Sequence, residues 1–89
     1  MQDLKEELFK KAVGEVLREL RTSCKNLSIN KFAAEYDFDK DNISKIEKGK
    51  YSIYLTTAWK LSEALGVDFV EFASKLKDKL GKDFKFIDE

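Results

Sequence analysis

The apolar residues of the chain fall at helical spacing over most of its length. In the N-terminal segment they recur every fourth residue, and a second set beside them widens the stripe: Leu4, Leu8, Ala12, Val16 and Leu20, then Phe9, Val13 and Leu17. A stripe with this period is typical of one face of an amphipathic α-helix. The pattern therefore predicts one long first helix that ends near Arg21 to Ser23.

The same spacing continues in shorter segments that are separated by polar residues and glycines. It predicts a second helix from Ile29 to Glu35, a third from about Lys40 to Lys48, a fourth from Leu55 to Leu65 and a fifth from about Phe69 to Gly81. Gly49, Gly66 and Gly81 stand where a helix can end, because glycine adopts the left-handed backbone conformation at little cost. We therefore expect an all-α fold with five helices.

Between the first and fourth helices the sequence reads as two short helices joined by a tight turn. Ser28 and Asp39 precede them, where a side-chain oxygen can accept hydrogen bonds from the free backbone N–H groups of the first turn. Ile43 and Ile46 must face inward, which leaves an outward set on the third helix: Lys40, Asp41, Ser44, Lys45 and Lys48. Two short helices with this connection make a helix-turn-helix motif, here at about 28–48.

The two ends of the chain carry apolar residues whose partners the pattern does not identify. Phe84 and Phe86 alternate with polar residues in a short C-terminal tail, 82–89, as in an extended segment. Three alternatives are open for this tail: packing on the domain, pairing with a second chain, or disorder. Leu4, Leu8 and Phe9 form either a dimerisation arm or a surface that packs on the protein's own C-terminal segment, which is the commoner use of an apolar stripe.

The composition is that of one soluble globular domain. Its 89 residues are 43% hydrophobic and 38% charged, which allows one modest core. The 17 basic residues are balanced by 17 acidic ones, and from Ser28 to Lys50 five lysines meet five acids. Charge therefore gives no independent support for binding nucleic acid, whose phosphates attract cationic residues. A neutral protein can still carry a basic face.

The residue types of common catalytic and metal sites are missing. With no histidine and one cysteine, Cys24, neither a structural zinc site nor a Ser–His–Asp triad is expected. A lone cysteine forms no intramolecular disulfide, which fits a reducing cytoplasm, and we expect a buried or half-buried thiol. No apolar run approaches the roughly 20 residues that span a bilayer. We therefore expect a cytoplasmic protein that is not an enzyme, with no metal, cofactor, small-molecule ligand or membrane partner.

With these elements in place, the chain resembles the phage repressor and Cro-type (XRE-like) helix-turn-helix transcription regulators. The resemblance covers about Val13 to Leu76 and rests on VGEVLRELR at 13–21, LS at 27–28, FA at 32–33, ISKIEKGK at 43–50 and ALGV at 64–67. It implies a compact five-helix, lambda-repressor-like domain over 1–81, followed by the tail. It also implies a structural ion pair between Arg21 and Glu47, in which a guanidinium can offer a carboxylate two parallel hydrogen bonds.

The resemblance further implies which residues meet DNA. Base reading in the major groove is assigned to Lys40, Asp41, Ser44 and Lys45, and phosphate contacts are assigned to Ser28, Lys31, Asn42, Lys48 and Lys50. Lysine can donate to O6 and N7 of guanine and aspartate can accept from N4 of cytosine, so this set favours G·C pairs. The implied function is that of a repressor or controller that binds a palindromic operator in double-stranded DNA as a homodimer.

The chain also departs from the pattern of this family. Ile29 stands where many relatives have a glutamine that reaches phosphate, and Tyr54 stands where a serine or threonine usually caps the fourth helix. Asp39 and Asp41 place negative charge near the DNA-facing end of the third helix. The alternative function is therefore a protein-interaction module on the same fold, such as an antitoxin whose main partner is a protein. The salt dependence of binding to duplex DNA discriminates between the two.

Overall fold

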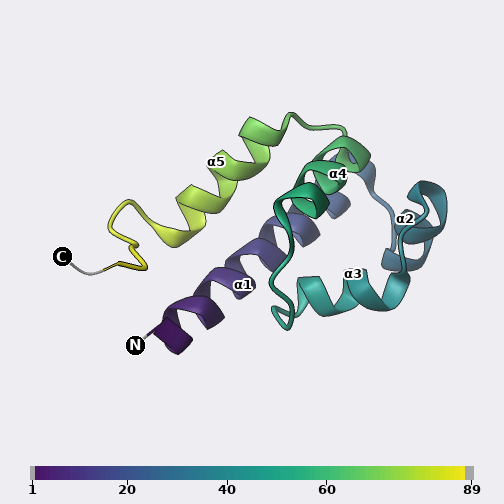
Figure 1. The fold of residues 1–89 in the computed structure, drawn as a ribbon. Coiled ribbons are helices and arrows are strands. Elements are labelled where there is room, and N and C mark those ends of the chain that lie inside the picture. The colour runs from purple at the N-terminus through teal and green to yellow at the C-terminus, as the bar shows by residue number, and fades with distance from the viewer. Residues whose placement is uncertain (1, 88–89) are drawn as a thin grey trace.

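The computed structural model describes residues 2–87 and is built from helices (Figure 1). In chain order the elements are α1 (Gln2–Leu20), the π-helical turn η1 (Arg21–Lys25), α2 (Ile29–Tyr36), α3 (Lys40–Glu47), α4 (Leu55–Leu65) and α5 (Phe69–Leu80). The described residues contain no strand, so the expected all-α fold with five α-helices is confirmed. No helix within 2–87 combines the length and the apolar character needed to cross a membrane.

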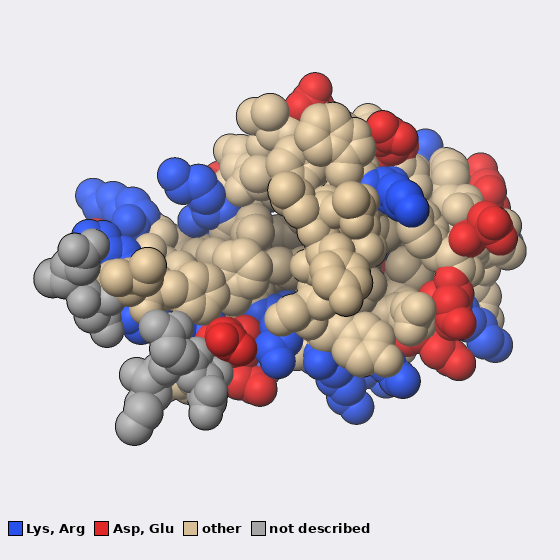
Figure 2. All heavy atoms as spheres, viewed as in Figure 1, with Lys and Arg blue, Asp and Glu red and all other residues tan. Residues whose placement is uncertain are grey.

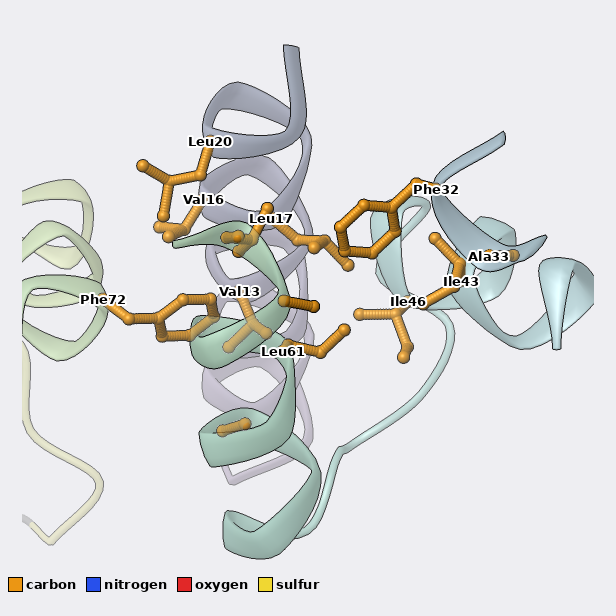
Figure 3. Close-up of a cluster of buried hydrophobic side chains, with 13 residues drawn as sticks. Val13, Val16, Leu17, Leu20, Phe32, Ala33, Ile43, Ile46, Leu61 and Phe72 are labelled. Carbon is orange, nitrogen blue, oxygen red and sulfur yellow. The ribbon is translucent and has the colours of Figure 1, made fainter. Parts of the chain in front are cut away.

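Helix α1 is the element around which the others pack. Helix α3 contacts one side of α1 and α5 lies against another, while α2 packs on α3 and α4 packs on α5 (Figure 1). Side chains from all five helices meet in one core, drawn in Figure 3: Val13, Val16, Leu17, Leu20, Phe32, Ala33, Ile43, Ile46, Leu61 and Phe72. The helix-turn-helix is thus mounted on α1 by its inward residues.

The contact between α1 and α3 depends on Gly14, in the middle of α1. A Cβ atom at this position would lie 2.4 Å from the carbonyl oxygen of Ile46 and 2.6 Å from that of Glu47. Both distances are far below van der Waals contact, so any side chain here would push the two helices apart. The absence of a side chain lets the C-terminal end of α3 lie directly on the backbone of α1.

The caps of the motif are formed as the sequence predicts. The Ser28 hydroxyl accepts from a first-turn N–H of α2 at 3.2 Å, and the Asp39 carboxylate accepts from two first-turn N–H groups of α3, at 2.8 and 3.4 Å. The turn between them passes through Asp37 in the left-handed conformation, with φ 61°. Gly49 follows α3 with φ 76°, as expected for a residue that ends a helix.

The end of the first helix differs from the prediction. After Leu20 the coil continues as η1 through Lys25 and ends at the left-handed Asn26, with φ 53°. The backbone hydrogen bonds of η1 are those of a π-helix, and an apolar pattern gives no signal for such a change of hydrogen-bond register. Cys24 lies in this turn and is exposed, so the prediction of a buried or half-buried thiol is wrong.

The described part of the tail packs on the domain. The rings of Phe84 and Phe86 meet each other at a centroid distance of 5.0 Å, and they lie 6.3 and 5.4 Å from the ring of Phe9. The tail begins with a turn, in which the Phe84 N–H donates to the Gly81 carbonyl at 3.2 Å, and is therefore folded back rather than extended. Phe9 thus packs on the protein's own C-terminal segment. Residues 88–89 of the expected tail lie outside the described residues.

Candidate nucleic-acid interface

Helix α3 is buried in the core on one side and exposed to solvent on the other. Its inward residues Ile43 and Ile46 are 1% and 4% exposed and lie in the core. Lys40, Asp41 and Lys45 are exposed on the other side, and Ser44 is half-buried beside them. Because these four positions are spaced i, i+1, i+4 and i+5, they form one strip along the helix. The structure therefore brings all four predicted base-reading residues together.

Arg21 and Glu47 form a bidentate ion pair between the end of α1 and the end of α3. The Arg21 Nε donates to Glu47 Oε2 at 2.7 Å and Nη2 donates to Oε1 at 2.9 Å. The remaining nitrogen, Nη1, donates to the Leu27 carbonyl at 2.6 Å, just before α2. The hydrogen bond to the Glu47 carboxylate raises the pKa of the Arg21 guanidinium, against the opposing effect of burial. One side chain thus ties together α1, α3 and the segment that leads into α2.

The predicted phosphate-binding residues lie at the two ends of the motif. Ser28 and Lys31 are exposed at the start of α2, and Asn42 is exposed in the first turn of α3. Lys48 and Lys50 are exposed on either side of Gly49, after α3. Ser28 accepts a backbone hydrogen bond through its oxygen, and its own O–H can still donate to a phosphate. The set therefore flanks the strip on α3 rather than interrupting it.

Tyr51 belongs to this surface, although the sequence analysis gave it no role. The Lys45 ammonium donates to the Tyr51 hydroxyl at 3.2 Å and lies 5.4 Å from the centroid of its ring. The hydrogen bond to the phenol raises the pKa of Lys45. Tyr51 follows α3 in an irregular segment, where helical periodicity no longer predicts which residues meet. The only signal in the sequence is an aromatic residue within reach of a lysine.

The surface around α2 and α3 is mixed in charge. Figure 2 shows lysines and acidic residues interspersed along the edge of the molecule that these helices form, with no continuous basic face in this view. This arrangement agrees with the five lysines and five acids counted between positions 28 and 50. Any attraction to phosphate must therefore come from individually placed lysines and helix N-termini, not from a general positive field.

Comparisons with known proteins place this geometry in a family. The profile of the helix-turn-helix family HTH_3 matches residues 17–72. Control protein C.MunI of Mycoplasma sp. is 36% identical over 64 residues, which cover 72% of this chain and 86% of that protein. Control protein C.BamHI of Bacillus amyloliquefaciens is 38% identical over 64 residues, which cover 68% of this chain and 79% of that protein.

A solved structure agrees with these matches. The crystal structure of an HTH_3 family transcriptional regulator from Vibrio cholerae superposes with a TM-score of 0.72 at 27% identity. The match covers 91% of this chain and 45% of that one, so the chain spans less than half the length of that regulator. The chain therefore belongs to the HTH_3 helix-turn-helix family, the phage repressor and Cro-type class of DNA-binding transcription regulators that its sequence resembles.

Proposed function

We propose that the chain is a sequence-specific transcription regulator of the controller type, a repressor or controller that enters the major groove of double-stranded DNA with α3. The observation that carries this proposal is the asymmetry of α3. Its inward side is fixed by Ile43, Ile46 and the Arg21–Glu47 pair. Its outward side presents one strip of polar side chains, of which all but the half-buried Ser44 are exposed. A rigid helix with an open polar face is what reading of base edges requires.

Base reading is assigned to Lys40, Asp41, Ser44 and Lys45. Lys45 is held by Tyr51, and its remaining two N–H groups can donate to O6 and N7 of one guanine. Asp41 lies one turn before Lys45 and can accept from N4 of cytosine. The preferred operator therefore contains G·C pairs at the contacted positions.

Phosphate binding is assigned to Ser28, Lys31, Asn42, Lys48 and Lys50. The exposed lysines among them supply charge at both ends of the motif, and the N-termini of α2 and α3 add backbone donors. These contacts fix the position of the domain on the duplex without reading sequence. Because the chain is neutral overall, we expect affinity to depend on these few contacts and to fall steeply with salt.

The functional unit is a homodimer on a palindromic operator. One domain of this size covers little DNA, whereas a two-fold dimer places two recognition helices about one helical turn apart. The relatives named control proteins support a regulator of this kind. The outward strip is short, so one copy of the protein can contact only a few base pairs. A second copy would double the number of base pairs that are read.

The test is a selection of binding sites from random duplexes with the full chain, followed by affinity measurements over a range of salt. We expect an inverted repeat with G·C pairs at the contacted positions. Lys45→Ala should relax the preference at one base position in each half-site. Lys48→Ala should weaken binding to all sequences alike and reduce the slope of log affinity against log salt by about 1 per lost contact.

Lys75→Ala is the matched control, because Lys75 is an exposed lysine on α5, away from the motif. This variant should bind DNA like the wild type. A strictly A·T consensus at the contacted positions would contradict the assignment of Lys45 and Asp41. No measurable binding to any duplex at low salt would overturn the proposal and favour the protein-interaction module.

A further inference from the structure

The segment that follows α3 packs on α1 at a second point, besides Gly14. A Cβ atom at Gly49 would lie 2.8 Å from Lys11 Cγ and 3.1 Å from Lys11 Cα. Gly49 is buried and has φ 76°, so both its backbone conformation and its contact with α1 favour glycine. Because Lys11 lies one turn before Gly14, the two contacts align the middle of α1 with the end of α3.

This second contact brings three lysines together. Lys48 and Lys50 flank Gly49 in the chain, and Lys11 of α1 packs on Gly49 itself. All three lysines are exposed, so each can extend its ammonium group into solvent while its aliphatic part packs on the protein. We refer to Lys11, Lys48 and Lys50 as the three-lysine site.

The backbone of the three-lysine site is held in place. The Gly49 N–H donates to the Ile46 carbonyl at 3.0 Å, and the Lys50 N–H donates to the Lys45 carbonyl at 2.9 Å, which closes the end of α3. On α1, Lys11 is followed directly by Ala12 and Val13, both buried. Only the lysine side chains therefore remain to be ordered by a ligand, which keeps the entropic cost of binding low.

The acids near the site leave it positively charged. Glu47 is bound by both arms of the Arg21 guanidinium, and Glu15 lies 3.8 Å from Lys79. Within residues 2–87, none of the three lysines is paired with a carboxylate. Glu7 is exposed one turn before Lys11 and reduces the local charge from +3 to +2. The site therefore remains cationic although the whole chain is neutral.

The site also lies next to the recognition strip. Lys48 comes four residues after Ser44, so it continues the outward side of α3. Figure 1 shows that the N-terminal half of α1 extends past the end of α3. A duplex that holds α3 in its major groove therefore presents its backbone to the end of α3 and to the adjoining part of α1.

We propose that Lys11 is a further phosphate-binding residue, so that the three-lysine site holds consecutive phosphates of one DNA strand beside the base pairs read by α3. This inference rests on the proposed function and adds α1 to the elements that bind DNA. Each ammonium group offers three donors to phosphate oxygens. Successive phosphates of one strand are roughly 3.4 Å apart along the duplex axis, so lysines on adjoining elements can bind neighbouring phosphates.

A role in stability accounts for two of the lysines but not for the third. Lys48 and Lys50 follow α3, and cations near the C-terminal end of a helix are stabilised by its dipole. Lys11 lies in the middle of a different helix and packs on Gly49 through Cγ and Cα, not through its ammonium group. The charge of Lys11 is therefore available to a ligand.

The test is equilibrium binding of the full chain to a random-sequence duplex, at salt concentrations from about 50 to 200 mM. Lys11→Gln keeps the Cβ and Cγ atoms and removes the charge. It should lower affinity at low salt by roughly 5-fold, as for one exposed ion pair, and reduce the slope of log affinity against log salt by about 1. Lys11→Arg keeps the charge and should bind like the wild type.

Lys75→Gln is the matched control, since it removes the same charge from an exposed lysine of α5 and should not change the salt slope. Circular dichroism should show the same melting temperature for the wild type and all three variants, because each substitution is at an exposed position.

The bound phosphate can be located with the selected operator by replacing one phosphate at a time with a neutral methylphosphonate. The wild type should lose affinity at one or two positions beside the contacted base pairs. Lys11→Gln should show no further loss at those same positions, because the interaction is already absent. Additive losses at every position would show that Lys11 touches no phosphate and would overturn the proposal.

Two other results would also overturn it. Equal salt slopes for the wild type and Lys11→Gln would show that Lys11 binds no phosphate, and an equal decrease in Lys75→Gln would show a response to net charge alone. Failure of the proposed function gives a different result. In that case the wild type itself binds no duplex at low salt, whereas an incorrect assignment of Lys11 leaves wild-type binding intact.

Discussion

The two sides of α3 differ in how strongly the rest of the protein constrains their side chains. Its inward side makes contacts that are buried and specific: two isoleucines in the core, a bidentate ion pair at Glu47 and a close approach to Gly14. Its outward side is exposed, and the hydrogen bond of Lys45 to Tyr51 is its principal side-chain contact among the described residues. The inward side therefore determines where the helix lies, and the outward side remains accessible to a binding partner.

This difference makes the two sides separable by mutation. A change on the inward side should alter the stability of the fold and, through it, every function of the protein. A change on the outward side should leave the melting temperature in place and alter only recognition. The four predictions below test this separation.

The largest effect is expected from Glu47→Ala. Removal of this carboxylate leaves the Arg21 guanidinium buried without its ionic partner, which should lower the free energy of unfolding by about 3–5 kcal/mol. That is a large part of the roughly 5–15 kcal/mol typical of a domain. Urea denaturation followed by circular dichroism measures the loss. Glu7→Ala, on the exposed face of α1, is the control, and a loss below about 1 kcal/mol for Glu47→Ala would contradict the prediction.

A somewhat smaller loss is expected from Gly14→Ala. In an isolated helix this change would stabilise by about 1 kcal/mol, because alanine is the better helix former. Here the added methyl group would meet two backbone carbonyl oxygens of α3, so we expect destabilisation of about 2 kcal/mol. Ala34→Gly, at an exposed position of α2, measures the helix-propensity effect alone. A Gly14→Ala protein that melts above the wild type would show that α1 and α3 are not in close contact.

Asp39 caps α3 and also carries a charge near its outward strip, so its replacement should affect both the stability of the fold and the affinity for DNA. Asp39→Ala removes the cap of α3 and should lower the free energy of unfolding by about 1 kcal/mol. It also removes a negative charge near the strip, so affinity for duplex DNA at low salt should rise. Asp39→Asn keeps the cap and removes the charge, and should raise affinity with little loss of stability. Thermal melting and fluorescence anisotropy with a labelled duplex measure the two quantities, and equal behaviour of the two variants would refute this division.

The smallest effect on stability is expected from Tyr51→Phe. The ring is kept and the hydroxyl group is lost, so the melting temperature should not change. Because the hydrogen bond to this hydroxyl raises the pKa of Lys45, its removal should lower that pKa towards the ordinary lysine value. The measurement is a pH titration of the lysine side-chain signals by NMR. Tyr54→Phe removes a hydroxyl from a more exposed tyrosine and should leave the Lys45 titration unchanged.

The inward side was predictable because its determinants are local and periodic. Helical spacing identified Ile43 and Ile46, and the residue types at Ser28 and Asp39 identified the caps. The Arg21–Glu47 contact came from the family resemblance instead, because nothing in the spacing of two residues 26 positions apart indicates that they meet. The role of Gly14 was not predicted either, because a close approach of two backbones leaves no hydrophobic pattern.

The outward surfaces were less predictable, for a physical reason. An apolar residue at helical spacing can face the core or a second exposed face, and the spacing is the same in both cases. Leu55 and Trp59 follow the same helical spacing as the buried residues of α4, yet they are 72% and 53% exposed. The contact between Lys45 and Tyr51 was missed because it joins a helix to an irregular segment. The π-helical turn η1 at the end of the first helix was not predicted, because a π-turn changes the backbone hydrogen-bond register without changing the apolar pattern.

Gly14 has a consequence for engineering. Because the contact it permits is made by main-chain atoms of α3, the orientation of that helix does not depend on which side chains it carries outward. Positions 40, 41, 44 and 45 can therefore be randomised together on a constant scaffold, provided that glycine is kept at position 14. A library of this kind would vary the residues assigned to base reading while α3 keeps its position on α1. It would be a source of regulators with new operator sequences.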